Sequence, residues 1–254
     1  MASACFRFKQ FTVWHDQCAM KVGTDGVLLG AWCPVREFRG SEVQEFRGSG
    51  GFIKVLDVGT GSGLIALMLA QRIHGAQITA IDIDCGAVEQ AKYNFSVSPW
   101  ADRLACLQTA LQELEGESMY DLIVSNPPYF QDSLKNPDTQ RARARHTDTL
   151  SYEELMKNCA RLLTKEGVLA LVLPIEAEQQ IISLARTYGL YPTHITHVYP
   201  KPRKPAKRLL IAFSLSPKTY SEASDSCSPN CLTLESETAP RSEEYKELTK
   251  EFYL

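Results

Sequence analysis

Asn126, Pro127 and Tyr129 stand in a segment whose residue types could hold a planar amine for chemistry. They follow the apolar run 120–124, which predicts a buried strand. Two prolines directly after a strand end its ladder, because neither has an N–H to donate, and the first restricts Asn126 to an extended conformation. The Asn126 amide oxygen and the Pro127 carbonyl oxygen could each accept one hydrogen of an exocyclic amine. The Tyr129 ring could stack on the ring that carries that amine.

A second group of candidate residues follows the apolar strand predicted at 53–58. Its glycines allow a tight turn and let a ligand approach without a Cβ in the way. The next predicted strand, 77–81, ends in an acid, which suits the hydroxyls of a ribose. That acid would also fit a nicotinamide or flavin dinucleotide, but the Gly-Thr-Gly-Ser-Gly pattern resembles the S-adenosylmethionine signature of Rossmann-like methyltransferases. The candidate cofactor residues here are Asp57, Gly59, Gly61, Gly63, Asp82 and Ile83.

Two basic segments could contact the phosphates of a nucleic acid. The long polar stretch 131–149 directly follows the Tyr129 segment, a common place for a substrate lid. The stretch 199–208 has five cations and three prolines in ten residues, which predicts an extended basic loop between two strands. A solvated loop that only connects its neighbours is the alternative for both. The candidate RNA-binding residues are Phe130, Arg141, Arg143, Arg145, His146, Lys201, Arg203 and Lys204.

Strand and helix patterns alternate along the chain, which indicates an α/β fold with a mostly parallel, doubly wound sheet. Ligands in such sheets bind beyond the carboxyl ends of the strands. The glycine turn, Asp82 and Asn126 should therefore meet at one edge. Seven strands are predicted at 53–58, 77–81, 103–108, 120–124, 167–173, 190–198 and 208–215, with helices at 64–73, 86–97, 151–163 and 176–188 on both faces. Ser151 and Glu154 should form a capping box at the start of the helix 151–163. We also expect a short strand or extended arm at 6–14, a helix that begins at Val27 and a terminal amphipathic helix at 242–252.

Length and composition fit one soluble globular domain: 254 residues, 44% apolar and 22% charged. No apolar run is long enough to cross a bilayer, and the N-terminus lacks an apolar signal core, so we expect a cytoplasmic protein. The eight cysteines form no C-x-x-C pair, which favours reduced thiols and no metal site.

The net charge of −3 conceals an uneven distribution. The segment 217–254 contains eight acidic and four basic residues, leaving 22 acidic and 23 basic residues in the rest of the chain. A body with a net charge of +1 and local basic clusters can bind RNA through those clusters.

The Asn126-Pro127-Pro128-Tyr129 tetrapeptide is a mark of amino methyltransferases that act on adenine N6, guanine N2 or protein glutamine. The chain resembles the bacterial tRNA1(Val) adenine-37 N6-methyltransferases in the segments 8–11 and 20–32 and in Ala144-Arg145-His146 before Ser151. The resemblance covers the chain from Phe6 to about Leu215. The resemblance implies a class I Rossmann-like fold and S-adenosylmethionine as cofactor. It also implies in-line methyl transfer to N6 of adenine 37, flipped or unpaired, in the anticodon stem-loop of a tRNA. No metal or obligate protein partner is expected.

The resemblance also assigns residues and boundaries. In this family the 23–26 segment lines the cofactor pocket, and the acid that meets the adenine amine is replaced here by Ala110, which leaves that contact to backbone groups. The cofactor residues implied are Lys21, Thr24, Asp25, Ala110, Leu111 and Asn126. A single domain, 1–254, would comprise a cofactor-pocket segment at 1–32, a loop insertion at 36–51, the Rossmann-like core at 53–216 and a partly flexible acidic tail at 217–254.

Several alternatives stay open at this point. A release-factor glutamine methyltransferase usually has a helical N-terminal domain, and a DNA adenine methyltransferase has a target-recognition domain; this chain has no segment that fits either. A guanine-N2 rRNA methyltransferase is harder to exclude, because the same oxygens accept from any amine. A SAM-binding regulatory protein would not need Asn126 and Tyr129.

Overall fold

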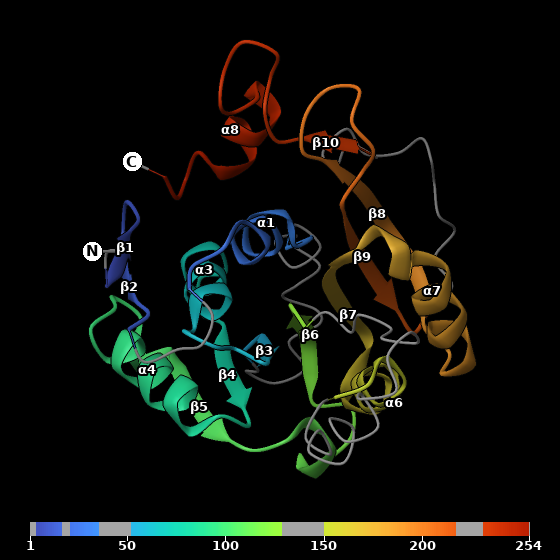
Figure 1. Ribbon diagram of the computed structural model, residues 1–254. Helices are drawn as coiled ribbons and strands as arrows, with labels where there is room; N and C mark the ends of the chain where they lie inside the picture. The colour runs from blue at the N-terminus through green and yellow to red at the C-terminus, as the bar shows by residue number, and fades with distance from the viewer. Residues whose placement is uncertain (1–3, 17–20, 36–51, 129–149, 217–230, 254) are drawn as a thin grey trace, which may run out of the picture.

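A central sheet with helices on both faces organises the molecule (Figure 1). The computed structural model describes residues 4–16, 21–35, 52–128, 150–216 and 231–253. Within these ranges no helix is long and apolar enough to span a membrane. The strands are β1 (Cys5–Arg7), β2 (Thr12–Trp14), β3 (Lys54–Val58), β4 (Gln77–Asp82), β5 (Leu104–Gln108), β6 (Tyr120–Ser125), β7 (Leu163–Pro174), β8 (Tyr191–Tyr199), β9 (Arg208–Ser214) and β10 (Cys231–Thr233). The α-helices are α1 (Thr24–Trp32), α3 (Leu64–Arg72), α4 (Cys85–Ser96), α6 (Tyr152–Leu162), α7 (Glu178–Thr187) and α8 (Glu243–Thr249), and the 3-10 turns are η2 (Ala101–Arg103), η3 (Leu111–Glu113) and η4 (Ile175–Ala177).

The main sheet has eight strands in the order β10-β8-β9-β7-β6-β3-β4-β5. Strand β9 runs antiparallel to β7 and β8, and the other neighbours are parallel. The seven predicted strands correspond to β3–β9, which confirms the Rossmann-like sheet. The eighth, β10, comes from the segment predicted as a loose tail and pairs Leu232 with Val198.

Alternation along the strands divides the interior into two apolar cores. On β7, Val168 and Ala170 belong to the core under α1, α3, α4 and α8, whereas Leu169 and Leu171 belong to the core under α6 and α7. Successive side chains of a strand point to opposite faces, so a fully buried strand must be apolar throughout. The helices on the two sides of the sheet in Figure 1 cover these two cores.

Helix α1 packs closely on α3 through two glycines. A Cβ on Gly26 would lie 3.0 Å from Cδ2 of Leu64, and one on Gly30 would lie 2.6 Å from Sδ of Met68. Gly26 and Gly30 are four residues apart, and so are Leu64 and Met68. The two helices therefore run side by side in the same direction. Both helices therefore begin at the same edge of the sheet.

The N-terminal segment and the segment around β10 differ from what the sequence pattern predicts. The segment 6–14, expected as one short strand or arm, is a hairpin in which Cys5 pairs with Trp14. The tail expected at 217–254 contains β10 and the predicted terminal helix, and its Leu232, Tyr245 and Phe252 are buried in the main core. The insertion predicted at 36–51 lies outside the described residues.

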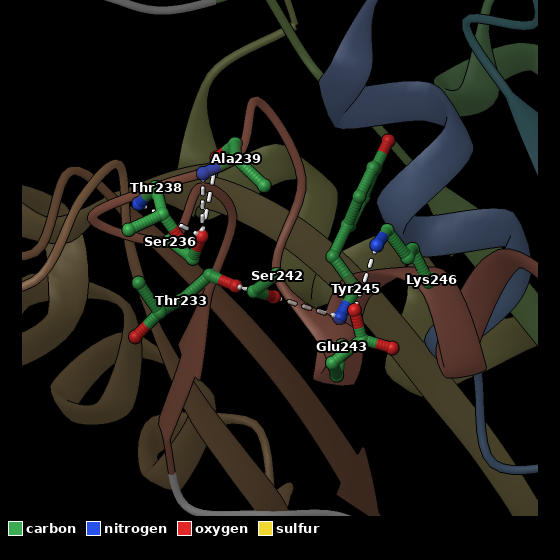
Figure 2. Close-up of polar contacts among 8 residues, drawn as sticks. All are labelled: Thr233, Ser236, Thr238, Ala239, Ser242, Glu243, Tyr245 and Lys246. Carbon is green, nitrogen blue, oxygen red and sulfur yellow. Dashed lines mark hydrogen bonds and ion pairs between the residues drawn. The ribbon is translucent and has the colours of Figure 1, made fainter.

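Side-chain bonds fasten this C-terminal segment (Figure 2). The Ser242 hydroxyl accepts from the Tyr245 N–H at 3.0 Å, which caps α8, and donates to the Thr233 carbonyl at the end of β10. The Ser236 hydroxyl accepts from the Ala239 N–H at 2.8 Å and holds the turn between them. Residues 231–253 are thus an integral part of the fold.

Candidate active site

The glycine turn after β3 has the backbone geometry that only glycine adopts without strain. Gly59, Gly61 and Gly63 have φ angles of +69°, +55° and +81°. A Cβ built at Gly59 or Gly61 would meet no atom of the described residues within 4 Å, whereas one at Gly63 would lie 2.5 Å from the Phe95 ring. The first two glycines therefore border open space that a ligand can enter. The third is required by the packing of α3 against α4.

Asp57 lies fully buried beneath this turn. Its Oδ2 accepts from the Thr60 hydroxyl at 2.6 Å and from the Ala66 N–H at 3.2 Å. Its Oδ1 is buried and has no hydrogen-bond partner among the described residues. Burial raises the pKa of Asp57 to about 7, and the Asp82 charge adds to the rise, while the Thr60 and Ala66 bonds oppose it. A buried acceptor without a partner calls for a donor, which an ordered water or a ligand can supply.

This buried acid makes the cofactor-free protein less stable as pH rises from about 4 to about 7. The unfolded chain ionises Asp57 near its usual pKa, whereas the folded chain keeps the proton until about pH 7, so each pH unit in that window favours unfolding. We expect Asp57→Asn to remove about 2–4 kcal/mol of this loss between pH 4 and pH 8. Urea unfolding of wild type and variant across that range checks it. Thr60→Val should act in the opposite direction, and identical pH profiles for wild type and Asp57→Asn would contradict the assignment.

Asp82 ends β4 beside the turn. Its Oδ2 accepts from the Gly61 N–H at 2.9 Å and its Oδ1 from the Asp84 N–H at 3.0 Å. Ile83 next to it is 51% exposed, so its side chain is accessible at this edge of the sheet. The predicted pair Asp82 and Ile83 thus borders the same open space as Gly59 and Gly61.

Ala110 and Leu111 follow β5, and the Thr109 N–H donates to the Asp82 carbonyl at 3.1 Å, which holds them near the β4 end. The Leu111 side chain is buried in the second core. The Ala110 carbonyl accepts from the Glu113 N–H at 3.1 Å. A contact from their backbone groups to an adenine stays a prediction.

The amine-binding segment begins where β6 ends. The Ser125 hydroxyl donates to the Val58 carbonyl at 2.8 Å, and Ser125 pairs with Val58 in the sheet. Asn126 and Gly59 directly follow β6 and β3 in the chain. They therefore lie side by side at the edge of the sheet. Asn126 is half-buried, Pro127 is buried, and Pro128 is exposed. The predicted Tyr129, Phe130, Arg141, Arg143, Arg145 and His146 lie outside the described residues.

The N-terminal cofactor residues reach the same edge through α1. This helix begins at Thr24, three residues earlier than the sequence pattern predicts, with Gly23 at the N-cap position. Lys21 and Thr24 are exposed, and the Asp25 carboxylate accepts from Nε of Arg208 at 2.9 Å. Arg208 is a site residue that sequence reasoning counted only as one more cation of the basic loop.

Asn94 is a second residue that the sequence did not single out. It is fully buried on α4. Its amide accepts from the Trp14 N–H at 2.9 Å and donates to the Trp14 and Ser62 carbonyls, each at 2.8 Å. One side chain thus joins the N-terminal hairpin to the glycine turn. Its partners lie 80 and 32 residues away in the chain, so no local pattern marks it.

The basic loop between β8 and β9 also lies at the ligand edge, because Arg208 pairs with Pro174, the last residue of β7. Its exposed Lys201 and Arg203 form ion pairs with Glu235 at 2.9 Å and Glu237 at 3.4 Å. Such exposed pairs contribute little stability, so a phosphate can displace the carboxylates. Lys204 is likewise exposed.

Comparisons with known proteins show the family to which the chain belongs. The family model described as "Methyltransferase small domain" matches residues 43–191. Proteins named tRNA1(Val) (adenine(37)-N6)-methyltransferase from Parabacteroides distasonis and Bacteroides thetaiotaomicron are 50% and 46% identical, each covering 100% of this chain and 99% of the relative. One from Flavobacterium johnsoniae is 44% identical over 98% of this chain and 99% of its own.

Solved structures share the fold at low identity. A predicted O-methyltransferase from Agrobacterium tumefaciens superposes with a TM-score of 0.61 at 15% identity, covering 90% of this chain and 96% of that one. A geranyl diphosphate C-methyltransferase from Streptomyces coelicolor, solved with S-adenosyl-L-homocysteine, gives 0.50 at 11% identity over 71% of this chain and 79% of that one. At these identities the likeness concerns the fold alone.

Proposed function

The chain belongs to the family of tRNA1(Val) (adenine(37)-N6)-methyltransferases, and we propose that it transfers a methyl group from S-adenosylmethionine to N6 of adenine 37 in that tRNA. One observation carries the proposal beyond family membership. The bond from Ser125 to the Val58 carbonyl sets Asn126 beside Gly59, so an amine acceptor borders the open space of the glycine turn. Cofactor and amine can then meet at one edge of the sheet.

The residues around that space fit S-adenosylmethionine. Gly59 and Gly61 leave room that a Cβ would fill, and the exposed Ile83 offers an apolar face. Asp82 would accept hydrogen bonds from the ribose hydroxyls, and Oδ1 of Asp57, which has no partner among the described residues, could take a donor from the cofactor. When bound, the cofactor supplies an electrophilic methyl group on a sulfonium.

The chain's own part in the reaction is to hold the acceptor nitrogen. The Asn126 amide oxygen and the Pro127 carbonyl oxygen would each accept one N6 hydrogen, which favours a pyramidal nitrogen with its lone pair directed at the methyl. Orienting two reactants in this way can lower a barrier by roughly 7–11 kcal/mol. Tyr129 would stack on the adenine, which must be unpaired or flipped to reach the loop.

RNA contacts are assigned to the two basic segments. Lys201, Arg203 and Lys204 extend from the ligand edge on the β8–β9 side of Asn126, where they can meet the phosphates of a tRNA stem. The cations at Arg141, Arg143 and Arg145 follow Asn126 in the chain and would contact the same RNA. These are charge contacts that position the RNA; the target base is read in the amine pocket.

Nucleoside analysis tests the substrate and the modified atom together. The protein is incubated with S-adenosylmethionine and tRNA from cells that lack this modification, and the digested RNA is examined by mass spectrometry. We expect N6-methyladenosine, mapped to position 37 of tRNA1(Val). N2-methylguanosine would instead indicate a guanine-N2 methyltransferase, and no modified nucleoside would contradict RNA methylation.

A charge variant in the basic loop tests the RNA contact. Lys204→Ala should weaken tRNA binding and reduce the slope of log K against log salt by roughly 0.7–0.9, because one phosphate contact is lost. Lys92→Ala, which removes an exposed lysine paired with Glu89 on α4, is the matched control and should leave the slope unchanged. Filter binding across a salt titration measures both. Equal slopes for wild type and Lys204→Ala would remove Lys204 from the RNA interface.

A further inference from the structure

An ion pair joins Asp25, in the segment predicted to line the cofactor pocket, to Arg208, at the end of the basic loop that the proposed function assigns to RNA. Nε of Arg208 donates to Oδ2 of Asp25 at 2.9 Å, across 183 residues of sequence. Nη1 of the same guanidinium donates to the Lys207 carbonyl at 3.0 Å. The Arg208 and Asp25 side chains are only 31% and 22% exposed, so water screens this pair less than the pairs of Lys201 and Arg203.

One end of the pair reaches the glycine turn. Asp25 lies in the first turn of α1, next to Gly26, which packs against Leu64. Leu64 directly follows Gly63, the last glycine of the turn. Because Gly26 has no side chain, the backbone of the first turn of α1 packs directly on Leu64 at the start of α3. A displacement of this turn would therefore displace the start of α3. The Asp25 carboxylate is therefore mechanically connected to the cofactor space.

The other end of the pair closes the basic loop. Arg208 is the first residue of β9 and lies opposite Pro174 and Val198 in the sheet. The loop before it contains Lys201 and Arg203, whose present partners are the carboxylates of Glu235 and Glu237. Bound phosphates would replace these partners, so the contacts of this loop differ between the RNA-free and RNA-bound states.

We propose that Arg208 is a positioning residue that couples tRNA binding at the basic loop to cofactor binding at the glycine turn. The inference depends on the proposed function, since it takes the basic loop as an RNA contact. RNA that fixes the loop also fixes Arg208, which holds the first turn of α1 against α3 and so favours the cofactor-binding geometry. Coupling between two sites is reciprocal, so the cofactor strengthens tRNA binding by the same factor. The planar guanidinium suits this role because it holds a fixed direction to both Asp25 and its own loop.

The experiment measures the dissociation constant of S-adenosylhomocysteine, which cannot transfer a methyl group, by calorimetry with and without saturating unmodified tRNA. Wild type should bind it at least about 5-fold more tightly with tRNA present. In Arg208→Met and in Asp25→Asn this ratio should fall to within about 2-fold of one. Arg208→Lys retains the charge but loses the planar fork, and should give an intermediate ratio.

The matched control is Arg203→Met, in the same loop but paired with Glu237. It should weaken tRNA binding and retain the wild-type ratio. A purely structural ion pair would lower the melting temperature of Arg208→Met and Asp25→Asn and leave the ratio unchanged; that result overturns the proposal. A wild-type protein whose ratio is one overturns it too. Methylated nucleosides from the same preparation test the proposed function separately, because the binding ratio is measured without turnover.

Discussion

Asn126→Ala should lower the rate of tRNA methylation by at least about 10²–10³-fold, the loss seen when one preorganised polar group at a reacting atom is removed. Alanine deletes the acceptor that holds one N6 hydrogen, and leaves the Pro127 carbonyl as the single oxygen facing the amine. Cofactor binding should persist, because the glycine turn and Asp82 are bonded to each other and not through Asn126. Single-turnover methylation of unmodified tRNA measures the first quantity and calorimetry with S-adenosylmethionine the second.

A buried asparagine elsewhere gives the control for this variant. The Asn158 amide donates to the Glu154 carbonyl at 2.9 Å and accepts from Arg161 at 3.2 Å, all in the neighbourhood of α6. Asn158→Ala should cost stability and leave the single-turnover rate within a few-fold of wild type. If Asn126→Ala also keeps its rate within a few-fold, the amine-acceptor mechanism is wrong.

The parts of the fold that the sequence predicts are those with strong local patterns. The strands β6, β7 and β9 are mostly apolar and buried along their length, which gives a strong local signal. The capping box predicted at Ser151 and Glu154 is present, with each residue bonded to the N–H of the other at 3.1 Å and 2.9 Å. The glycine turn is equally visible, because its conformation allows no other residue type without strain.

The terminal helix α8 was predicted, but strand β10 was not, for a physical reason. Strand β10 has three residues, too few for a periodic signal, and its pairing to β8 is settled by the backbone bonds from Leu234 to Tyr199 and from Glu235 to Pro200. The Ser- and Glu-rich composition around it indicates disorder, yet the buried Tyr245 and Phe252 hold it to the core. Composition is an average over the whole segment. The burial of Leu232, Tyr245 and Phe252 is enough to order residues 231–253.

The candidate site divides in the same way. Asp57, the glycines and Asp82 could be found because they stand within one strand–turn–helix–strand unit with a known spacing. Asn94 and Arg208 could not, since their partners are brought together by the fold across 80 and 183 residues. The residues predicted to contact the ligand thus carry a local sequence pattern, whereas Asn94 and Arg208 do not.

Alanine at Gly61 should mainly weaken cofactor binding, whereas alanine at Gly63 in the same turn should mainly lower stability. At Gly61, a Cβ would enter open space beside Asp82, so Gly61→Ala should raise the dissociation constant of S-adenosylmethionine at least about 10-fold, roughly 1.4 kcal/mol. Its cost to stability is the left-handed backbone alone, about 1–2 kcal/mol. At Gly63 the same backbone cost is joined by a contact of 2.5 Å with the Phe95 ring, so Gly63→Ala should lose about 2–5 kcal/mol.

Urea unfolding and calorimetry on both variants separate the two effects. Gly63→Ala should regain part of its stability in the double variant Gly63→Ala, Phe95→Leu, because the smaller side chain relieves the clash. For Gly61→Ala, the part of the chain that the structure describes offers no residue within 4 Å whose change could rescue it. The ligand space is thereby located by an experiment on the protein itself. If Gly61→Ala binds the cofactor as wild type does, the open side of the turn does not face the cofactor, and the placement of the site between Gly61, Asp82 and Asn126 fails with it.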